Sequence, residues 1–157
     1  MQQNNDYITF LLTVAFKFIL GSDINGVFSR LVKAVKGIEC FVQEKGKSFM
    51  LDDRLGYIHS CPTNLGTGMR ASLYICLPGW AKCGFSELQN RCTELSLQCR
   101  ELTNEESGSD LENVFDISNR NRLGFSEVEI IQNIIEGINN IYKEDLELQT
   151  KYETNDE

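Results

Sequence analysis

The sequence predicts an α+β fold in which an antiparallel sheet is flanked by helices. Apolar residues recur at helical spacing in 23–46 and again after Ser126. Between these two regions lie short segments rich in β-branched and aromatic residues, which Gly and Pro turns separate. Helices before and after a group of strands favour the α+β class.

The first segment, 7–20, reads YITFLLTVAFKFIL and is strongly apolar. It is shorter than the ~20 residues that a membrane-spanning helix needs. It contains Lys17, and the preceding MQQNND lacks the basic residues of a signal peptide. We therefore expect a buried strand or helix rather than an anchor, and the alternation of large apolar residues favours a strand.

A helix is expected next, with Asp23 as its N-cap and its end near Gly46. Its apolar positions are Ile24, Val27, Phe28, Leu31, Val35, Ile38 and Val42. A short strand is expected at 55–60, followed by a compact loop at 61–68.

The middle of the chain continues with a strand at 70–77, rich in β-formers, which Pro78-Gly79 stops. A helix over 85–96 follows, with Phe85, Leu88, Cys92 and Leu95 on one face. The next segment, 97–100, is expected to be another strand.

The segment 101–113 is polar, acidic and without periodicity, so we expect a mobile loop. A short strand is predicted at 114–118. The last helix begins at Ser126 with a capping box formed with Glu129, and we expect fraying beyond Lys143. Its expected apolar face comprises Val128, Ile131, Ile134, Ile135, Ile138 and Ile141. We divide the chain into an apolar segment (1–22), a central domain (23–146) and an acidic tail (147–157).

The chain has 157 residues and a net charge of −8, which argues against nucleic acid or an anionic membrane as a partner. Its six cysteines have no zinc-binding or redox CxxC spacing, and we predict no metal site. We expect reduced thiols, most of them buried as small apolar groups, and a cytoplasmic location.

Cys61 is the first candidate reactive residue, because it lies at a strand end before a Pro turn, with a hydroxyl at Thr63. A hydrogen bond from Thr63 would stabilise the thiolate. The alternatives are an inert buried thiol or a redox-sensing cysteine.

Arg70 and Arg100 lie at strand ends, where an arginine fork can reach phosphate oxygens. The alternative for each is a surface ion pair with one of the 23 acidic residues. The adjacent NLGTG lacks the ending of a Walker phosphate loop.

The motif CPTNLGT at 61–67 resembles the signature of the phosphagen kinases, the ATP:guanidino phosphotransferases. The segments 48–78, 114–138 and 23–39 also resemble blocks of that family, in order. The resemblance runs from Asp23 to Leu146 and implies the C-terminal half of a glutamine synthetase-like catalytic domain.

The resemblance implies reversible transfer of the γ-phosphoryl group of MgATP to a guanidino nitrogen. It places Cys61 at the substrate-binding thiol and Glu105 at a guanidinium-binding carboxylate. The nucleotide-binding positions that it implies are Arg70, Ala71, Ser72, Leu73, Tyr74, Arg100, Glu101, Leu102, Thr103, Asn104 and Glu105.

The sequence also departs from the family pattern. Phe10 and Val14 stand where the family has a catalytic glutamate and a nucleotide-binding arginine. After Arg100 the loop has lost the glycines that let it fold over a nucleotide. The family's N-terminal domain is absent from these residues.

We therefore expect a guanidino kinase fragment that binds MgATP or MgADP and arginine, taurocyamine or creatine, and that is inactive alone. The alternative is a non-catalytic remnant that acts as a binding or regulatory half-domain. Expected protein partners are a second copy of the chain or a full-length kinase.

Overall fold

The structure is a computed structural model that describes residues 24–101 and 113–155. The predicted strand within 7–20 and residues 102–112 of the predicted mobile loop lie outside the described residues. Glu101, which was predicted to begin that loop, is instead the last residue of a strand. The described chain divides into two compact units. Unit 1 comprises 24–69 and 122–125, and unit 2 comprises 70–101, 113–121 and 126–155.

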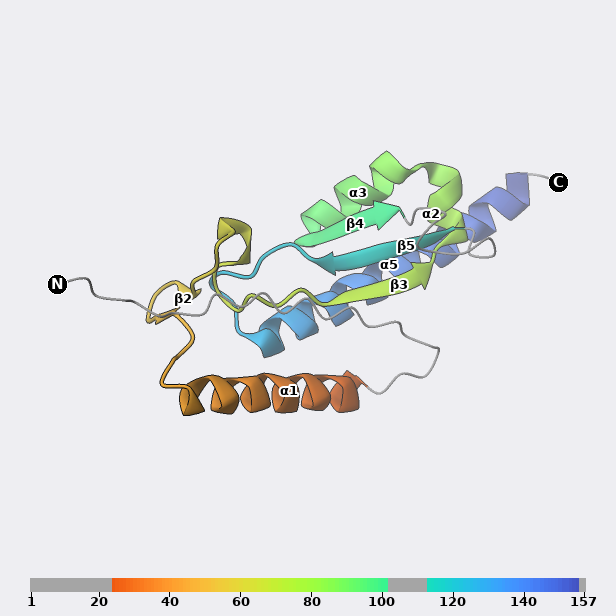
Figure 1. The fold of residues 1–157 in the computed structure, drawn as a ribbon. Coiled ribbons are helices and arrows are strands. Elements are labelled where there is room, and N and C mark those ends of the chain that lie inside the picture. Colours follow the sequence, from red (N-terminus) through yellow and green to blue (C-terminus); the bar gives the residue numbers. More distant parts are fainter. Residues whose placement is uncertain (1–23, 102–112, 156–157) are drawn as a thin grey trace. The chain divides into compact units, whose positions relative to one another are not determined.

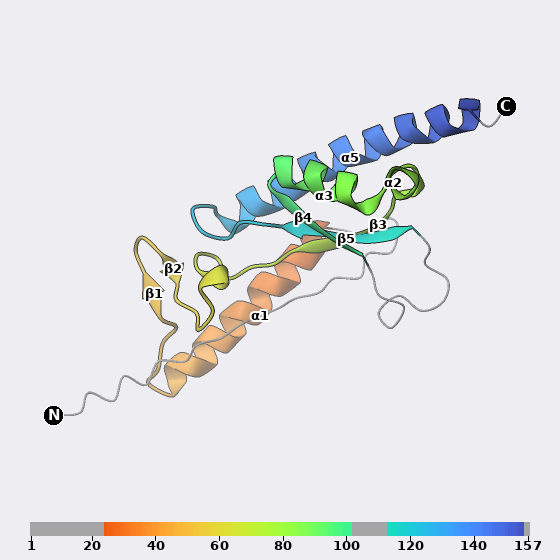
Figure 2. The same ribbon diagram turned by 90° about the horizontal axis from the view of Figure 1, so that it is seen from above.

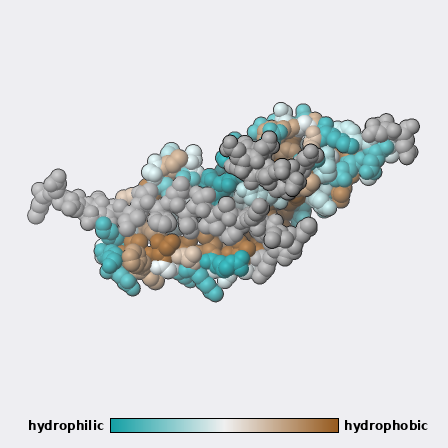
Figure 3. Space-filling model, turned by 45° about the vertical axis from the view of Figure 1, so that its right-hand side comes forward, coloured by the Kyte–Doolittle hydropathy of each residue, from teal (hydrophilic) through white to brown (hydrophobic). Residues whose placement is uncertain are grey.

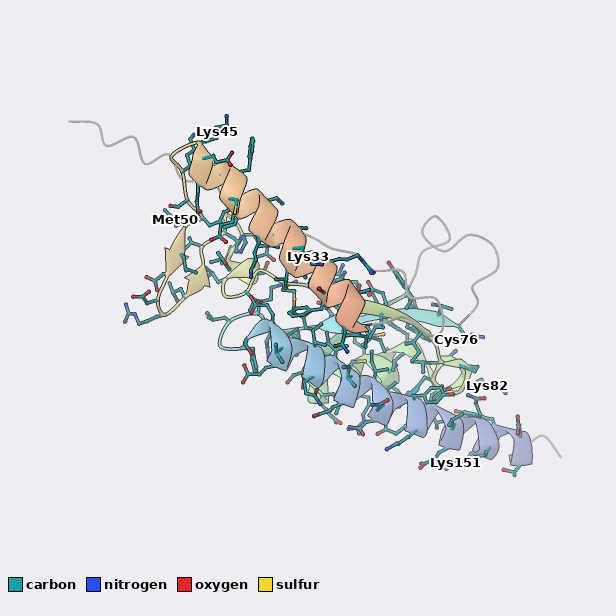
Figure 4. The ribbon with its side chains drawn as sticks, turned by 90° about the horizontal axis from the view of Figure 1, so that it is seen from below. Lys33, Lys45, Met50, Cys76, Lys82 and Lys151 are labelled. Atoms are coloured by element: carbon teal, nitrogen blue, oxygen red, sulfur yellow. The ribbon has the colours of Figure 1, made fainter. Side chains whose placement is uncertain are left out.

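Unit 1 begins with α1 (Ile24–Glu44), as predicted (Figure 1). Of its apolar residues only Val42 is buried, and Phe41 is 61% exposed. Figure 3 shows apolar surface, in brown, beside hydrophilic surface, in teal, over this helix. Lys33 on α1 and Lys45 just after it are exposed (Figure 4), and the Lys45 ammonium lies 5.5 Å from the centre of the Phe41 ring.

The rest of unit 1 is a small antiparallel ribbon followed by a turn. The ribbon pairs β1 (Leu51–Asp52), which was not predicted, with β2 (Gly56–Tyr57), a shorter strand than expected. A single 3₁₀ turn, η1 (Pro62–Asn64), follows within the predicted loop.

Unit 2 is built on a three-stranded antiparallel sheet in the order β3 (Ser72–Cys76), β5 (Val114–Asn119) and β4 (Leu97–Glu101). The predicted strands are confirmed, although their pairing order was not predicted. The helices α2 (Pro78–Cys83), α3 (Phe85–Glu94) and α5 (Glu127–Asn155) lie on one side of this sheet (Figure 2).

The core of unit 2 lies between that side of the sheet and the helices. Alternation along the strands directs apolar side chains toward the helices, and Phe115 stacks on Phe85 with ring centroids 6.3 Å apart. The most deeply buried apolar side chains are Leu77, Leu88, Cys92, Leu97, Cys99, Ile117, Ile134 and Ile141, all at 2% exposure or less.

One helix was not predicted, and one expectation for the helices is wrong. Pro78 stops β3, as expected, but it also occupies the first turn of the unpredicted α2, a position where its missing N–H costs nothing. The acidic end does not fray after Lys143, since α5 continues to Asn155. The buried Asp145 accepts a 2.9 Å hydrogen bond from the Trp80 backbone N–H and so ties α5 to α2.

One residue of the predicted apolar face on α5 is also misplaced. Val128 is 66% exposed, whereas Ile130, which was not predicted, is buried. The predicted capping box is confirmed, because Glu129 Oε2 accepts a 2.7 Å hydrogen bond from the Ser126 N–H. Lys82 on α2 and Lys151 on α5 lie at the same end of unit 2 (Figure 4).

Candidate functional site

The predicted site residues fall into both units and are described in each separately. Cys61 belongs to unit 1, while Arg70 to Glu101 belong to unit 2. Leu102, Thr103, Asn104 and Glu105 lie outside the described residues.

In unit 1, the segment 61–68 is here called the Cys61 loop. Cys61 is an exposed free thiol at the start of η1. Its Sγ lies 2.9 Å from Thr63 Oγ1, which confirms the contact that the sequence suggested and excludes an inert buried thiol. The side-chain hydrogen bond with Thr63 is the main reason that the pKa of Cys61 is lowered, and a backbone hydrogen bond with Thr63 and the charge of Arg122 lower it further.

The Cys61 loop is held by contacts with Arg122, which sequence reasoning did not identify. Arg122 Nη1 donates to the Thr63 carbonyl at 3.1 Å, and the Arg122 carbonyl accepts from the Thr67 N–H at 3.1 Å. Gly66 permits this approach, because its φ is +101° and a Cβ there would overlap the Arg122 carbonyl oxygen. The sequence signal was the position of Arg122 in the second matched block, three residues after VFDISN.

In unit 2, one side of the sheet carries polar side chains and faces away from the helices of that unit. We call it the polar face. It comprises Ser72, Tyr74, Gln98, Arg100, Asp116 and Ser118, which the strand register places in two rows of three. Ala71 and Leu73 alternate to the other side, and so does Glu101, which pairs with Phe115.

Asp116 lies at the centre of the polar face. It pairs across the sheet with Tyr74 on β3 and with Arg100 on β4. Its Oδ2 also accepts a 2.6 Å hydrogen bond from Arg70 Nη2. The side chains of Arg70 and Asp116 are 20% and 11% exposed, so this is a largely buried ion pair. The sheet therefore pairs one predicted phosphate-binding arginine, Arg70, with Asp116 and places the other, Arg100, opposite Asp116 in the strand register.

The polar face also holds polar atoms that are not satisfied. Arg70 Nε, Asp116 Oδ1 and Ser118 Oγ are buried without hydrogen-bond partners among the described residues. Buried polar groups are costly to leave unpaired. The guanidinium of Arg70 thus keeps a donor that a phosphate oxygen could use.

All six cysteines are free thiols. The expectation that most of them are buried is wrong, because only Cys92 and Cys99 are buried and the other four are exposed. Within 24–101 and 113–155, no cluster of three or more His, Cys, Asp or Glu could hold a metal ion. No helix in the same residues is long and apolar enough to cross a membrane.

Comparison with known families agrees with this arrangement. The sequence model of the family described as ATP:guanido phosphotransferase, C-terminal catalytic domain, matches residues 17–148. The chain is 42% identical to an arginine kinase of Anthopleura japonica over 133 residues, which are 83% of the chain. Over 143 residues, 86% of the chain, it is 37% identical to the testis isozyme of creatine kinase of Oncorhynchus mykiss. The chain spans 17% and 36% of these two relatives.

Solved structures give the same result. A lombricine kinase superposes on 83% of the chain with a TM-score of 0.70 and 33% identity, and the match covers 35% of that protein. The duplicated taurocyamine kinase of Schistosoma mansoni, with bound transition state analogue components, superposes on 78% of the chain with a TM-score of 0.65 and 28% identity. That match covers 16% of the kinase.

Proposed function

Because the chain belongs to the ATP:guanido phosphotransferase family, we propose that it supplies the C-terminal catalytic part of a guanidino kinase. The reaction is the reversible transfer of the γ-phosphoryl group of MgATP to a guanidino substrate such as arginine, taurocyamine or creatine. The geometry of Asp116 supports this proposal most, since it pairs with Arg70 and lies opposite Arg100.

In this proposal the polar face binds the phosphates. Arg70 and Arg100 neutralise the negative charge that phosphoryl transfer must stabilise. Asp116 and Ser72 hold the two terminal nitrogens of Arg70, at 2.6 Å and 3.5 Å, and its Nε–H has no partner among the described residues and could donate to a phosphate oxygen. Asp116 also limits the repulsion between the two arginines before the nucleotide binds.

The Cys61 loop binds the guanidino substrate. A thiolate at Cys61, stabilised by Thr63, attracts the positively charged guanidinium and orients its reacting nitrogen. Glu105, which the family resemblance assigns to the same substrate, adds a second negative charge. Neither Cys61 nor Glu105 forms a covalent bond with the substrate, because positioning and charge stabilisation account for most of the catalysis of phosphoryl transfer.

We propose that a magnesium ion enters with the nucleotide. Mg²⁺ at phosphoryl-transfer sites is held mainly by phosphate oxygens and water, with one or two carboxylates. Asp116 is a carboxylate on the polar face, and its Oδ1 has no partner among the described residues. The ion would supply charge neutralisation of the β- and γ-phosphates.

Titration of the intact chain with MgADP tests the nucleotide assignment. We expect Arg70→Ala to weaken binding about tenfold or more, since a charged hydrogen bond contributes about 1.5–3 kcal/mol. Arg91→Ala is the matched control, because Arg91 pairs with Glu94 and Glu144, away from the sheet. Equal losses in the two variants would refute the assignment.

A second candidate function is a non-catalytic remnant that binds or regulates, either as a homodimer or by pairing with a full-length kinase. Phe10 and Val14 favour it, because they replace residues that the family uses for catalysis. We expect no phosphorylated arginine, creatine or taurocyamine from these residues alone, as followed by phosphorus NMR. A product that disappears with Cys61→Ala would contradict that expectation.

The size of the native polypeptide separates the two candidates. An antibody against 144–157 would detect a band well above 17.9 kDa if these residues belong to a longer kinase. A band at 17.9 kDa would favour the remnant.

The six free thiols support a cytoplasmic location, which we propose on that ground.

A further inference from the structure

Arg122 contacts the Cys61 loop at two points. Its side chain donates to the Thr63 carbonyl and its own carbonyl accepts from the Thr67 N–H, both at 3.1 Å. Thr63 and Thr67 lie on either side of the tight Gly66 turn, and Arg122 is 59 residues further along than Thr63. A single distant residue therefore holds both halves of the loop.

The contact with Thr63 matters because of what the Thr63 hydroxyl does. Its Oγ1 lies 2.9 Å from Cys61 Sγ, so the orientation of Thr63 decides whether the thiolate receives a hydrogen bond. The 3₁₀ turn that carries Thr63 has only short-range backbone bonds of its own, from Asn64 N–H to Cys61 O and from Leu65 N–H to Pro62 O. Such an exposed single turn has little to fix its geometry without an outside anchor.

We propose that Arg122 is a positioning residue for the guanidino-kinase reaction, which orients Thr63 toward Cys61 so that the thiolate is held ready for a guanidinium. The role rests on the function proposed above. Arg122 acts through Thr63 and touches neither substrate nor nucleotide in this account. Its positive charge adds a smaller effect in the same direction, because it also lowers the pKa of Cys61.

The test measures how fast Cys61 reacts with iodoacetamide as a function of pH in the intact chain. Trypsin releases residues 55–70 as one peptide, which contains Cys61 and none of the other five cysteines, so mass spectrometry reports this thiol alone. The variants are Arg122→Lys, which keeps a donor and the charge, Arg122→Gln, which keeps a donor, and Arg122→Met, which keeps neither. Arg120→Met is the matched control, since Arg120 is an exposed arginine of unit 2.

We expect the reaction profile to move toward higher pH in the order Lys, Gln, Met, with Arg120→Met matching the wild type. At pH 7 the Met variant should react about threefold slower or more, as expected when the hydrogen bond from the Thr63 hydroxyl to the thiolate is partly lost. If the circular dichroism spectrum shows that Arg122→Met does not fold, the profiles of Arg122→Lys and Arg122→Gln test the proposal instead. Coincident profiles for the wild type and the folded variants would overturn the proposal.

A double substitution separates positioning from charge alone. In a Thr63→Val background there is no hydroxyl to orient, so Arg122→Gln should change the profile less than it does in the wild type. An undiminished effect would overturn the role through Thr63. The assay contains no nucleotide or guanidino compound, so failure of the proposed function is detected by the MgADP titration and failure of this contact by alkylation.

Discussion

The Cys61 loop of unit 1 and the polar face of unit 2 hold their candidate functional residues by different means. The polar face is carried by a sheet whose opposite side is packed against three helices, and its arginine–carboxylate pair is largely buried. The Cys61 loop is exposed at residues 61–63 and is shaped by glycines and by hydrogen bonds to the side chain and the carbonyl of Arg122. Packing therefore positions the phosphate-binding arginines, whereas local turn geometry tunes the thiol.

This difference corresponds to two chemical tasks. Neutralising a triphosphate needs several fixed charges, which a rigid sheet provides. Activating a thiol needs an exposed position with a well-placed hydroxyl donor, which a tight turn provides. Substitutions in unit 2 should consequently change stability most, and substitutions in the Cys61 loop should change thiol reactivity most.

The largest expected effect is that of Leu88→Ala in the core of unit 2. Leu88 on α3 is fully buried, so its truncation should lower the free energy of unfolding by about 2–5 kcal/mol. Urea denaturation followed by circular dichroism measures this. Leu146→Ala on α5, where the side chain is 45% exposed, is the control, and similar losses in the two variants would show that the core is not where we describe it.

A glycine substitution tests the turn that shapes the Cys61 loop. Gly66→Ala should destabilise the chain by more than about 2 kcal/mol, because it combines left-handed strain with overlap of the Arg122 carbonyl. Gly124→Ala is the matched control, since Gly124 has a φ of +83° but open space around it. It should cost only about 1–2 kcal/mol of strain. If both variants unfold at the same urea concentration, overlap with the Arg122 carbonyl adds nothing to the backbone strain at Gly66, which contradicts the prediction.

The capping box of α5 gives a smaller effect with a defined pH dependence. Ser126→Ala should lower the stability of unit 2 by about 1 kcal/mol. The hydrogen bonds from Ser126 lower the pKa of Glu129 below its usual 4.5. Their contribution is therefore complete above pH 4.5 and is lost as the pH falls below it. A difference between wild type and Ser126→Ala that persists undiminished in strong acid would argue against the capping box.

The smallest expected effect on stability, but a specific one on reactivity, is that of Thr63→Val. Without the hydroxyl the pKa of Cys61 should rise toward its usual 9.0, and the alkylation profile should shift to higher pH. Thr67→Val is the control, because the Thr67 hydroxyl accepts from the Met69 N–H and does not contact Cys61. Identical alkylation profiles for the two variants would show that the Thr63 hydroxyl does not lower the pKa of Cys61.

Local signals in the sequence were sufficient for most of the elements. The apolar spacing of α1, the β-rich strands and the Ser126–Glu129 capping box each depend on neighbouring residues, and all are confirmed. The persistence of α5 past Lys143 depends on Asp145 and its contact with Trp80, 65 positions away. A contact over that distance leaves no local pattern, so the acidic composition was misleading.

The same reasoning separates what was predicted at the site from what was not. The contact of Cys61 with Thr63 spans two residues and was predicted. The ion pair of Arg70 with Asp116 spans 46 residues and was not, because it requires the strand order β3-β5-β4. Arg122 was missed for the same reason, since its role depends on the return of the chain to unit 1 between β5 and α5.

The central claim is that the polar face of unit 2 binds the nucleotide. Nitrogen–proton NMR spectra of the intact chain during a MgADP titration test it most directly. The account predicts that the largest shifts occur at Arg70, Ser72, Arg100 and Asp116, with little change at Arg91 on α3. Shifts confined to α3 and α5, or no shifts at millimolar MgADP, would contradict it.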